Sequence, residues 1–538
     1  MTVEPTTAAA AEVPPSRVRG SLAVAAGILA SRVAGLVRQS VFAYYLGGGA
    51  GADVFNAALK IPNVLQNLLG EGAVSASFIP VYSRLRAEGR HREAVAVAGA
   101  VATLLALVTG ALVALGVAFA PQFVDLIAPG FEGARRAETV SLVRIVFPGV
   151  GLLVLSAWCL GILNSHRRFF LPYAVPMASS ATVVVALVVT GRAAGEFALA
   201  RAATYGIVAG ALAQLVVQLP AALRLVPGAR PSLGAASAEV RTVVSRFSGA
   251  LLSRGVAQLS GYIDQILASL LPVGAVATLA FAQTLNLLPV SLFGTAISAS
   301  ELPEMASATG TVDEVNRAVV KRLDAGLTRI AFFVVPSAMA FVALGGDIAG
   351  LLYQRGAFTR TQTVAVWATL AGSAVGLLGQ TMARLYSSAF YALGDTRTPM
   401  RVAALRLVLT AALGYVFAFP LLRALGIAPS WGTVGLSASA GLAGWIEYLV
   451  LRAALRRRVG ANGVAAPVLL RLWSIALSAA GAAWTVRLPL AAALGDRPML
   501  VAPPTLAVFG LGYLAAGVFV GDPTARALLA TLRRRIGR

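Results

Sequence analysis

Long apolar stretches separated by short basic segments run along almost the whole of this chain. A helix needs about 20 consecutive apolar residues to cross the hydrocarbon core of a bilayer, and stretches of that length recur throughout. Because lipid offers the backbone no hydrogen-bond partner, each stretch is expected to be an α-helix. The pattern therefore predicts an all-α polytopic membrane protein with about fourteen transmembrane helices. The expected spans are 21–46, 53–81, 94–119, 137–163, 169–191, 197–223, 242–271, 273–300, 324–352, 362–392, 399–425, 430–455, 466–488 and 500–520.

The composition agrees with a membrane protein. Of the 538 residues, 58% are hydrophobic and 12% are charged, and the mean hydropathy is +0.80. So little charge leaves too few polar side chains to cover a water-soluble fold of this size. The net charge is +22, but Lys and Arg lie between the apolar stretches and form no single basic face of the kind that binds nucleic acid. We therefore expect membrane lipids, and no nucleic acid, as partners.

The basic residues also predict the orientation. Lys and Arg are enriched in cytoplasmic loops, and here they follow the even-numbered spans, whereas loops 47–52 and 271–274 contain neither. Arg355 and Arg360 run against this trend. We expect a multi-pass protein of the bacterial cytoplasmic (inner) membrane with both termini in the cytoplasm. Residues 1–20 are expected to be a disordered cytoplasmic tail and residues 523–538 a basic cytoplasmic tail.

Cysteine and histidine offer no metal or redox chemistry. The single cysteine, Cys159, lies in an apolar stretch and has no partner for an intramolecular disulfide. His91 and His166 lie far apart in basic loops, without the spacing of a metal site. We expect no metal and no cofactor.

Two parts of the sequence recur at almost the same offset. The Ser-Arg pair at 31–32 recurs at 253–254, and the pattern in 63–80 recurs in 286–303, at offsets of 222 and 223 residues. The offset spans six helices, so the two halves keep one orientation, as in transporters whose substrate site lies between parallel repeats. The expected domains are an N-lobe at 21–225 with helices 1–6, a C-lobe at 240–457 with helices 7–12, and two added helices at 465–522.

Charged residues inside the spans are the candidate substrate contacts, because an ionisable group at mid-membrane is costly and usually functional. Arg32 lies about eleven residues into the first span, which places it near the bilayer midplane. Guanidinium groups bind phosphate with two parallel hydrogen bonds, so an excess of Arg favours a diphosphate ligand. The candidate substrate-binding residues are Arg32, Arg38, Asp53, Lys60, Asn63, Glu71 and Arg254.

The alternative is that these charges pair with one another, for example Arg38 with Asp53 or Glu71. Other charged residues within spans are interpreted as structural, and Asp264 as a weaker candidate for ion coupling. The structural set is Arg144, Arg329, Arg384, Arg406 and Glu447.

Helix-breaking residues occupy corresponding places in the second and eighth spans. Breaks at matching places in two halves indicate helices that bend around a cavity and move during alternating access. The residues are Pro62, Gly70, Gly72 and Pro80 in the second span, and Pro289, Gly294 and Pro303 in the eighth.

The segment from Ser31 to Leu85, SRVAGLVRQSVFAYYLGGGAGADVFNAALKIPNVLQNLLGEGAVSASFIPVYSRL, resembles the opening of the MurJ/MviN family of lipid II flippases. The resemblance rests on Ser-Arg-x-x-Gly-x-x-Arg, a Gly-rich turn, Asp-x-Phe, Lys-x-Pro-Asn and Glu-Gly-Ala-x-Ser, and extends to the segment from Ala392 to Pro399. It implies the fold of the multidrug/oligosaccharidyl-lipid/polysaccharide exporter superfamily. It also implies that Arg32 and Arg38 correspond to the family's arginines in the first helix, and that Asp53 corresponds to the family's aspartate after the Gly-rich turn.

The resemblance has departures. A further cavity arginine of the family falls at Gln66, and an acidic-basic pair falls at Gln283 and Thr284. Arg254 offers a compensating charge. The departures concern the exact substrate more than the fold.

The resulting hypothesis is a flippase, not an enzyme, that moves undecaprenyl-diphosphate-linked peptidoglycan precursor (lipid II) to the outer leaflet by alternating access. A membrane potential or a coupling ion would reset the carrier. The alternatives are a flippase for another polyprenyl-linked polysaccharide unit, a cation-coupled exporter of the same superfamily, or a non-transporting membrane scaffold. A glycosyltransferase is disfavoured, because the short outer loops offer only Asp125 and Glu132 as carboxylates in the longest of them.

Overall fold

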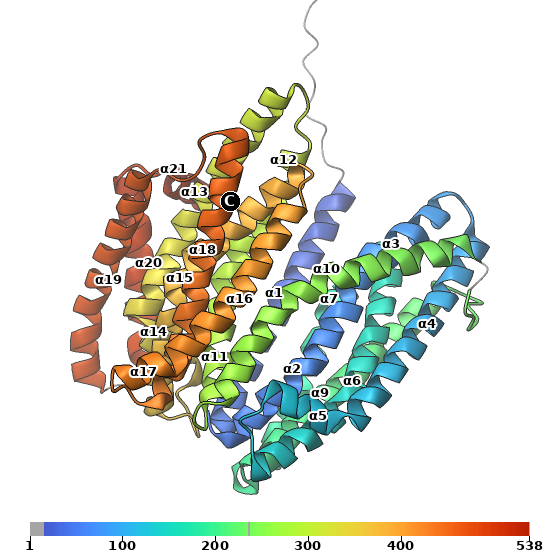
Figure 1. The fold of residues 1–538 in the computed structure, drawn as a ribbon, viewed down its shortest axis with the longest axis horizontal. Helices are drawn as coiled ribbons and strands as arrows, with labels where there is room; N and C mark the ends of the chain where they lie inside the picture. Colours follow the sequence, from blue (N-terminus) through green and yellow to red (C-terminus); the bar gives the residue numbers. More distant parts are fainter. Residues whose placement is uncertain (1–14, 169, 235–236, 496, 537–538) are drawn as a thin grey trace, which may run out of the picture.

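The structure is a computed structural model that describes residues 15–168, 170–234, 237–495 and 497–536 (Figure 1). These residues form helices and no strand. Two helical bundles stand side by side and diverge toward the top of Figure 1. Polytopic all-α architecture is thereby confirmed.

The first bundle comes from the N-terminal half of the chain. Its helices are α1 (Pro15–Leu46), α2 (Ala50–Leu69), α3 (Glu71–Ala87), α4 (His91–Ala118), α5 (Ala120–Ile127), α6 (Gly133–Ser165), α7 (Phe170–Ala174), α8 (Pro176–Thr190), η1 (Arg192–Ala194) and α9 (Glu196–Leu223).

The second bundle follows, and the last three helices pack on its outer side. Its elements are α10 (Ala238–Ser269), α11 (Ala275–Pro289), the π-helical η2 (Val290–Thr295), α12 (Ala296–Ala306), α13 (Val312–Ala343), α14 (Gly345–Tyr353), α15 (Arg360–Ala392), α16 (Arg397–Ala418), α17 (Pro420–Ala424), η3 (Pro429–Trp431) and α18 (Gly432–Val459). The last three are α19 (Ala466–Leu494), α20 (Pro498–Phe519) and α21 (Pro523–Ile536).

Eleven helices in the described part of the chain are long and apolar enough to cross a membrane. The remaining three expected spans correspond to α1, the α2–α3 pair and α10. These are the helices with the candidate intramembrane charges, such as Arg32, Lys60 and Asp264. The count of fourteen therefore stays a prediction, although every expected span coincides with one helix or with a broken pair.

The second and eighth spans are interrupted at corresponding places. Gly70 separates α2 from α3, and the π-helical turn η2 separates α11 from α12. Shifting residue 70 by the 223-residue offset of the repeat gives position 293, which lies inside η2. A π-turn disrupts the regular hydrogen-bond ladder of an α-helix, as a Gly break does, and such turns often mark functional sites. Both halves thus have an interrupted helix at the position that the Gly and Pro pattern indicates.

Small residues allow close helix packing in the second bundle. A Cβ added at Gly376 on α15 would lie 2.0 Å from the Cα of Gly441 on α18. In lipid, where the hydrophobic effect between helices is weak, such close backbone approach is a main source of association. The α15–α18 pair therefore forms a tightly packed centre of this bundle.

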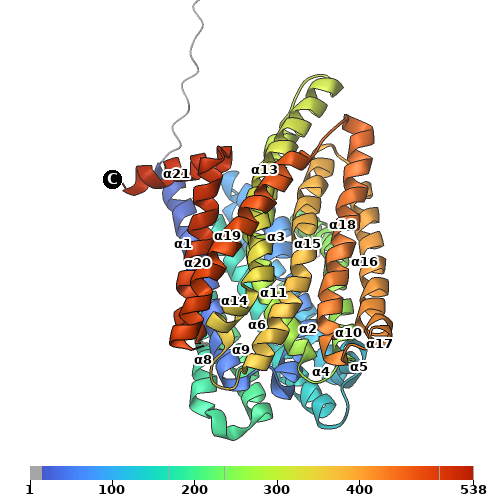
Figure 2. The same ribbon diagram turned by 90° about the vertical axis from the view of Figure 1, so that its left-hand side faces the viewer.

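Short helices were not expected from the sequence. Of these, α5, α14 and α17 lie at helix ends, and α21 turns away from the end of α20 (Figure 2). Asp522 stabilises the change of direction between α20 and α21. Its Oδ1 accepts hydrogen bonds from the backbone N–H groups of Thr524 at 2.9 Å and Ala525 at 3.2 Å, in the first turn of α21. Arg471 on α19 pairs with the same carboxylate at 3.1 Å.

Candidate functional site

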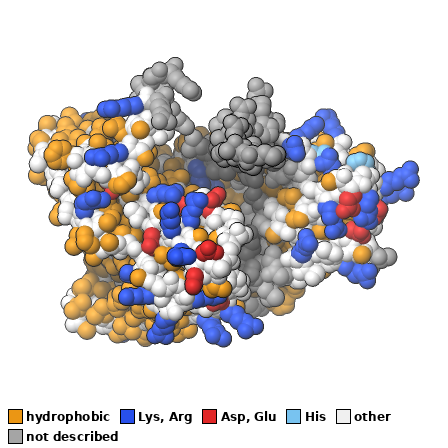
Figure 3. Space-filling view, turned by 90° about the horizontal axis from the view of Figure 1, so that it is seen from above, with side chains coloured by type: hydrophobic (Ala, Val, Ile, Leu, Met, Phe, Trp, Pro, Cys, Tyr) orange, Lys and Arg blue, Asp and Glu red, His pale blue; other side chains and the backbone are white. Residues whose placement is uncertain are grey.

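Two adjoining cavities open inside the first bundle. The larger has a volume of about 820 Å³ and the smaller about 470 Å³. Their linings share five residues from five helices, so the cavities form one continuous chamber. The shared residues are Ser31, Gln66, Leu153, Pro176 and Gln214. Seen from above, Lys and Arg side chains are spread over the described surface of both halves of the molecule, with Asp and Glu side chains among them (Figure 3).

The first helix supplies the charge of the chamber. Arg32 lines the larger cavity, with Ser31 beside it, and Arg38 lines the smaller one. Six residues separate the two arginines, or about 9 Å along the helix axis. Neither guanidinium forms a hydrogen bond or a salt bridge with the described residues. The two cations are therefore available to a ligand.

The described lining contains no carboxylate in either cavity. An unpaired guanidinium removed from bulk water is unfavourable unless water or an anion solvates it. The described lining is thus electropositive, and among its residues an anion meets no repelling acidic side chain.

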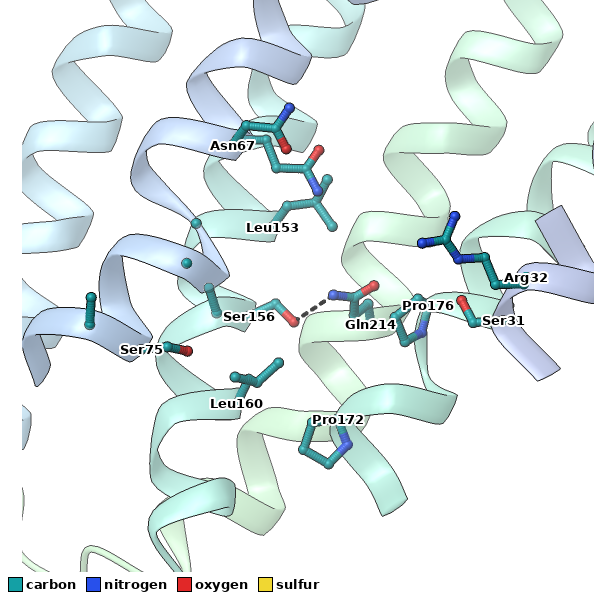
Figure 4. Close-up of a pocket in the computed structure, with 15 residues that line it drawn as sticks. Ser31, Arg32, Asn67, Ser75, Leu153, Ser156, Leu160, Pro172, Pro176 and Gln214 are labelled. Atoms are coloured by element: carbon teal, nitrogen blue, oxygen red, sulfur yellow. Dashed lines mark hydrogen bonds between the residues drawn. The ribbon is translucent and has the colours of Figure 1, made fainter. Parts of the chain in front are cut away.

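Uncharged amide and hydroxyl groups line the rest of the chamber. Asn63 and Gln66 lie on α2, and Gln214 lies on α9. Gln214 Nε2 donates to Ser156 Oγ on α6 at 3.0 Å. Figure 4 shows this pair in the middle of the view, with Arg32 on one side and Asn67 and Ser75 away from it. The sequence prediction missed Gln214 and Ser156, because uncharged polar residues within apolar spans carry no strong signal.

Asp53 was predicted to bind substrate, but it lines neither cavity. It is fully buried at the start of α2. Its Oδ2 accepts from Gly274 N at 2.7 Å and its Oδ1 from Ala277 N at 2.8 Å, while Arg135 pairs with it at 3.3 Å. Because Gly274 and Ala277 begin α11, a carboxylate of the first bundle caps a helix of the second, where the helix dipole favours negative charge. Asp53 therefore joins the two bundles.

Lys60 also points across the bundles and lines neither cavity. A Cβ built at Gly261 on α10 would lie 3.7 Å from Lys60 Nζ. One turn further along α10, Asp264 interacts electrostatically with this lysine. Among the described residues, Lys60 forms no salt bridge within 4.0 Å. Its place between α2 and α10 indicates a contact with the second bundle.

The structure brings three of the seven predicted residues, Arg32, Arg38 and Asn63, to the chamber. The side chains of Glu71 and Arg254 lie outside the described residues. Thr284 lines the smaller cavity and is its one described contribution from α11.

Three of the five charged residues interpreted as structural form ion pairs. Arg406 Nη1 donates to Glu447 at 2.9 Å, and Arg329 pairs with Glu301 at 3.2 Å. Within the part of the chain that the structure describes, no group of three His, Cys, Asp or Glu side chains is arranged to hold a metal ion.

Two helical bundles that stand side by side, with a polar chamber lined mainly by the first, define a membrane protein of the class that transports solutes through alternately exposed sites. The family model described as "Lipid II flippase MurJ" matches residues 42–496 of the 538-residue chain. The chain therefore belongs to the MurJ family.

Individual relatives agree. The chain is 30% identical over 448 residues to "Lipid II flippase MurJ" of Burkholderia cenocepacia, which covers 82% of this chain and 84% of that protein. It is 29% identical over 478 residues to "Probable lipid II flippase MurJ" of Rhizobium meliloti, which covers 86% of this chain and 85% of the relative.

Solved structures show the same fold. A lipid II flippase MurJ in an inward closed conformation is similar with a TM-score of 0.74 at 21% identity, covering 94% of this chain and 99% of that one. An inward-facing multidrug resistance MATE family transporter of the MOP superfamily matches with a TM-score of 0.62 at 15% identity, covering 79% of this chain and 94% of that one. The expected superfamily fold is thereby confirmed.

Proposed function

We propose that this protein is a lipid II flippase of the bacterial cytoplasmic membrane, which moves the undecaprenyl-diphosphate-linked precursor from the inner to the outer leaflet by alternating access. Transport requires no bond to be made or broken, so the protein is a carrier and not an enzyme. The observation that carries the proposal is the pair of unpaired arginines, Arg32 and Arg38, in a chamber without described carboxylates.

The ligand follows from the chemistry of this pair. A diphosphate carries several negative charges and acceptor oxygens, which guanidinium groups bind bidentately. The polyprenyl tail is as apolar as the bilayer and would stay in lipid while the head group enters the chamber. A flippase for another polyprenyl-diphosphate-linked glycan would need the same arginines, and the MurJ relatives favour lipid II over that alternative.

The direction of opening follows from Asp53. Its bonds to Gly274 and Ala277 close the bundles at the end where loops 47–52 and 271–274 lack Lys and Arg. Such loops are typical of the outer side of the membrane. The bundles thus diverge toward the cytoplasm, the side that supplies the precursor and on which both termini would lie.

The moving bodies in this mechanism are the N-lobe at 21–225 and the C-lobe at 240–457, with the helices at 465–522 as an attachment to the second. Release to the outer leaflet requires the cap between Asp53 and α11 to open. The bent α2–α3 and α11–α12 pairs supply the flexible points.

Rescue of a bacterium depleted of its own lipid II flippase tests the proposal. The wild-type chain should restore growth and the appearance of lipid II in the outer leaflet, whereas Arg32→Ala with Arg38→Ala should not. Arg144→Ala is the matched control, because Arg144 is an exposed arginine within a span that lines neither cavity. Failure of the wild type at normal expression would refute the function, and rescue by the double variant would refute the site.

A further inference from the structure

Besides its arginines, the chamber has a surface formed by two uncharged side-chain amides. Gln66 and Gln214 line both cavities, so they lie at the junction between them. They approach the chamber from different helices, α2 and α9. Every ligand that extends from one cavity into the other passes these two amides.

The two amides have unused hydrogen-bonding capacity. A side-chain amide offers two N–H donors and a carbonyl acceptor. Within the described residues the Gln66 side chain makes no hydrogen bond, and Gln214 makes one, through Nε2 to Ser156. The Gln214 carbonyl and its second N–H therefore remain available, as do both halves of the Gln66 amide.

Ser156 fixes the orientation of Gln214. Its side chain is fully buried on α6, and its Oγ accepts from Gln214 Nε2 at 3.0 Å. This bond holds one end of the Gln214 amide against α6 and leaves the other end directed to another partner. Ser156 is a positioning residue for Gln214.

An amide with both donor and acceptor free does not suit a diphosphate. Phosphate oxygens only accept hydrogen bonds, so the carbonyl of Gln214 or Gln66 would face them without a partner, at a cost in free energy. Hydroxyl and acetamido groups both donate and accept, and thus satisfy both ends of a glutamine amide. The chemistry of this surface matches a neutral carbohydrate and differs from that of the arginine pair on α1.

We propose that Gln66 and Gln214, the latter held by Ser156, form a subsite that binds the sugar portion of the lipid-linked substrate while Arg32 and Arg38 hold its diphosphate. This inference rests on the proposed function and assigns separate parts of the head group to separate walls of the chamber.

Binding of three lipids to the purified full-length protein, measured by native mass spectrometry, tests the subsite. The probes are undecaprenyl diphosphate, undecaprenyl diphosphate linked to the disaccharide without its peptide, and complete lipid II. For the two glycan-bearing lipids, Gln66→Leu with Gln214→Leu should lower affinity about tenfold or more, the equivalent of one or two lost hydrogen bonds. Affinity for undecaprenyl diphosphate should not change.

Two further variants complete the test. Gln218→Leu is the matched control: Gln218 lies on α9 one turn from Gln214, is fully buried and lines neither cavity. It should bind all three lipids like the wild type. Ser156→Ala should lower affinity for the glycan-bearing lipids about threefold, because a freed Gln214 has more orientations. A purely structural role of Ser156 would instead lower affinity for all three.

The outcomes separate this inference from the proposed function. Equal affinity of the double glutamine variant and the wild type for the disaccharide lipid overturns the sugar subsite. A loss seen with complete lipid II alone also overturns it, since the amides would then contact the peptide. If the wild type binds none of the three lipids, the proposed function itself fails.

Discussion

The arginines of the chamber and Arg406 of the second bundle lie in opposite surroundings. In the first bundle, Arg32 and Arg38 face a chamber and have no described partner. In the second, Arg406 bonds to Glu447 at 2.9 Å, and the helices around it pack at van der Waals contact. An arginine within a span is therefore no functional signal by itself. What distinguishes Arg32 and Arg38 is that each lines a cavity and has no described carboxylate beside it.

The largest effect is expected from breaking the ion pair between Arg406 and Glu447 in the second bundle. Arg406→Gln leaves the Glu447 carboxylate, 12% exposed, without its partner. We expect the free energy of unfolding to fall by about 3 kcal/mol, because an unpaired charge stays away from water. Arg32→Gln, which breaks no pair, should change it by less than about 0.5 kcal/mol. Denaturant unfolding in detergent measures both.

The double variant Arg406→Leu with Glu447→Leu is the control for this ion pair. Removal of both charges should recover most of the free energy of unfolding that Arg406→Gln loses. An equal loss of stability in Arg32→Gln would show that Arg32 has a structural partner, and the contrast between the bundles would be wrong.

The next effect concerns the residue that joins the bundles. Asp53→Ala removes the acceptor of the Gly274 and Ala277 N–H groups. We expect a loss of about 2 kcal/mol, the typical cost of leaving buried donors unsatisfied. Hydrogen exchange read by mass spectrometry should become faster at the start of α11. Unchanged exchange in this segment would mean that Asp53 does not hold the bundles together.

A smaller effect is expected from adding a methyl group at a glycine in each bundle. Gly376→Ala would press a methyl group into Gly441 of α18, and should cost about 1–3 kcal/mol through overpacking. Gly35→Ala places the same methyl group beside the chamber, where no atom lies within 4 Å. It should be neutral or stabilising by up to about 1 kcal/mol, because alanine favours the helix. Thermal unfolding of the pair decides, and similar losses in both variants would mean that the chamber is not open at Gly35.

The smallest effect depends on pH. His166, at the end of α6, lies 3.0 Å from Tyr82 Oη through its Nε2. Burial, with Arg86 and Arg168 nearby, lowers the pKa of His166 to about 4. The unfolded chain binds this proton near pH 6.5, so stability should fall as the pH is lowered from about 6.5 to about 4. His166→Gln should flatten that part of the stability curve, and an unchanged curve would contradict the assigned cause.

The spans were predictable because length and apolar character follow directly from the thickness of the bilayer. The break in α2–α3 was also visible, since Gly70 and the proline residues recur at the offset of the repeat. Helices such as α5 and α21 were missed because short elements outside the hydrocarbon core need no continuous apolar stretch.

The site was only partly predictable. Arg32 and Arg38 were found because charge within an apolar span is conspicuous. The role of Asp53 was not, since its partners Gly274 and Ala277 are 221 and 224 residues away and contribute backbone groups. Gln214 was missed for a different reason: a neutral amide in a span is common, and only the structure shows that it faces a chamber.

The most direct test of the central claim is the affinity of undecaprenyl diphosphate for the purified protein, compared with Arg32→Gln plus Arg38→Gln at two salt concentrations. The wild type should bind more weakly at high salt, and the double variant should bind at least about 100-fold more weakly, as expected for lost charge-assisted hydrogen bonds. Equal affinity in both proteins, independent of salt, would show that the two arginines do not form an anion site.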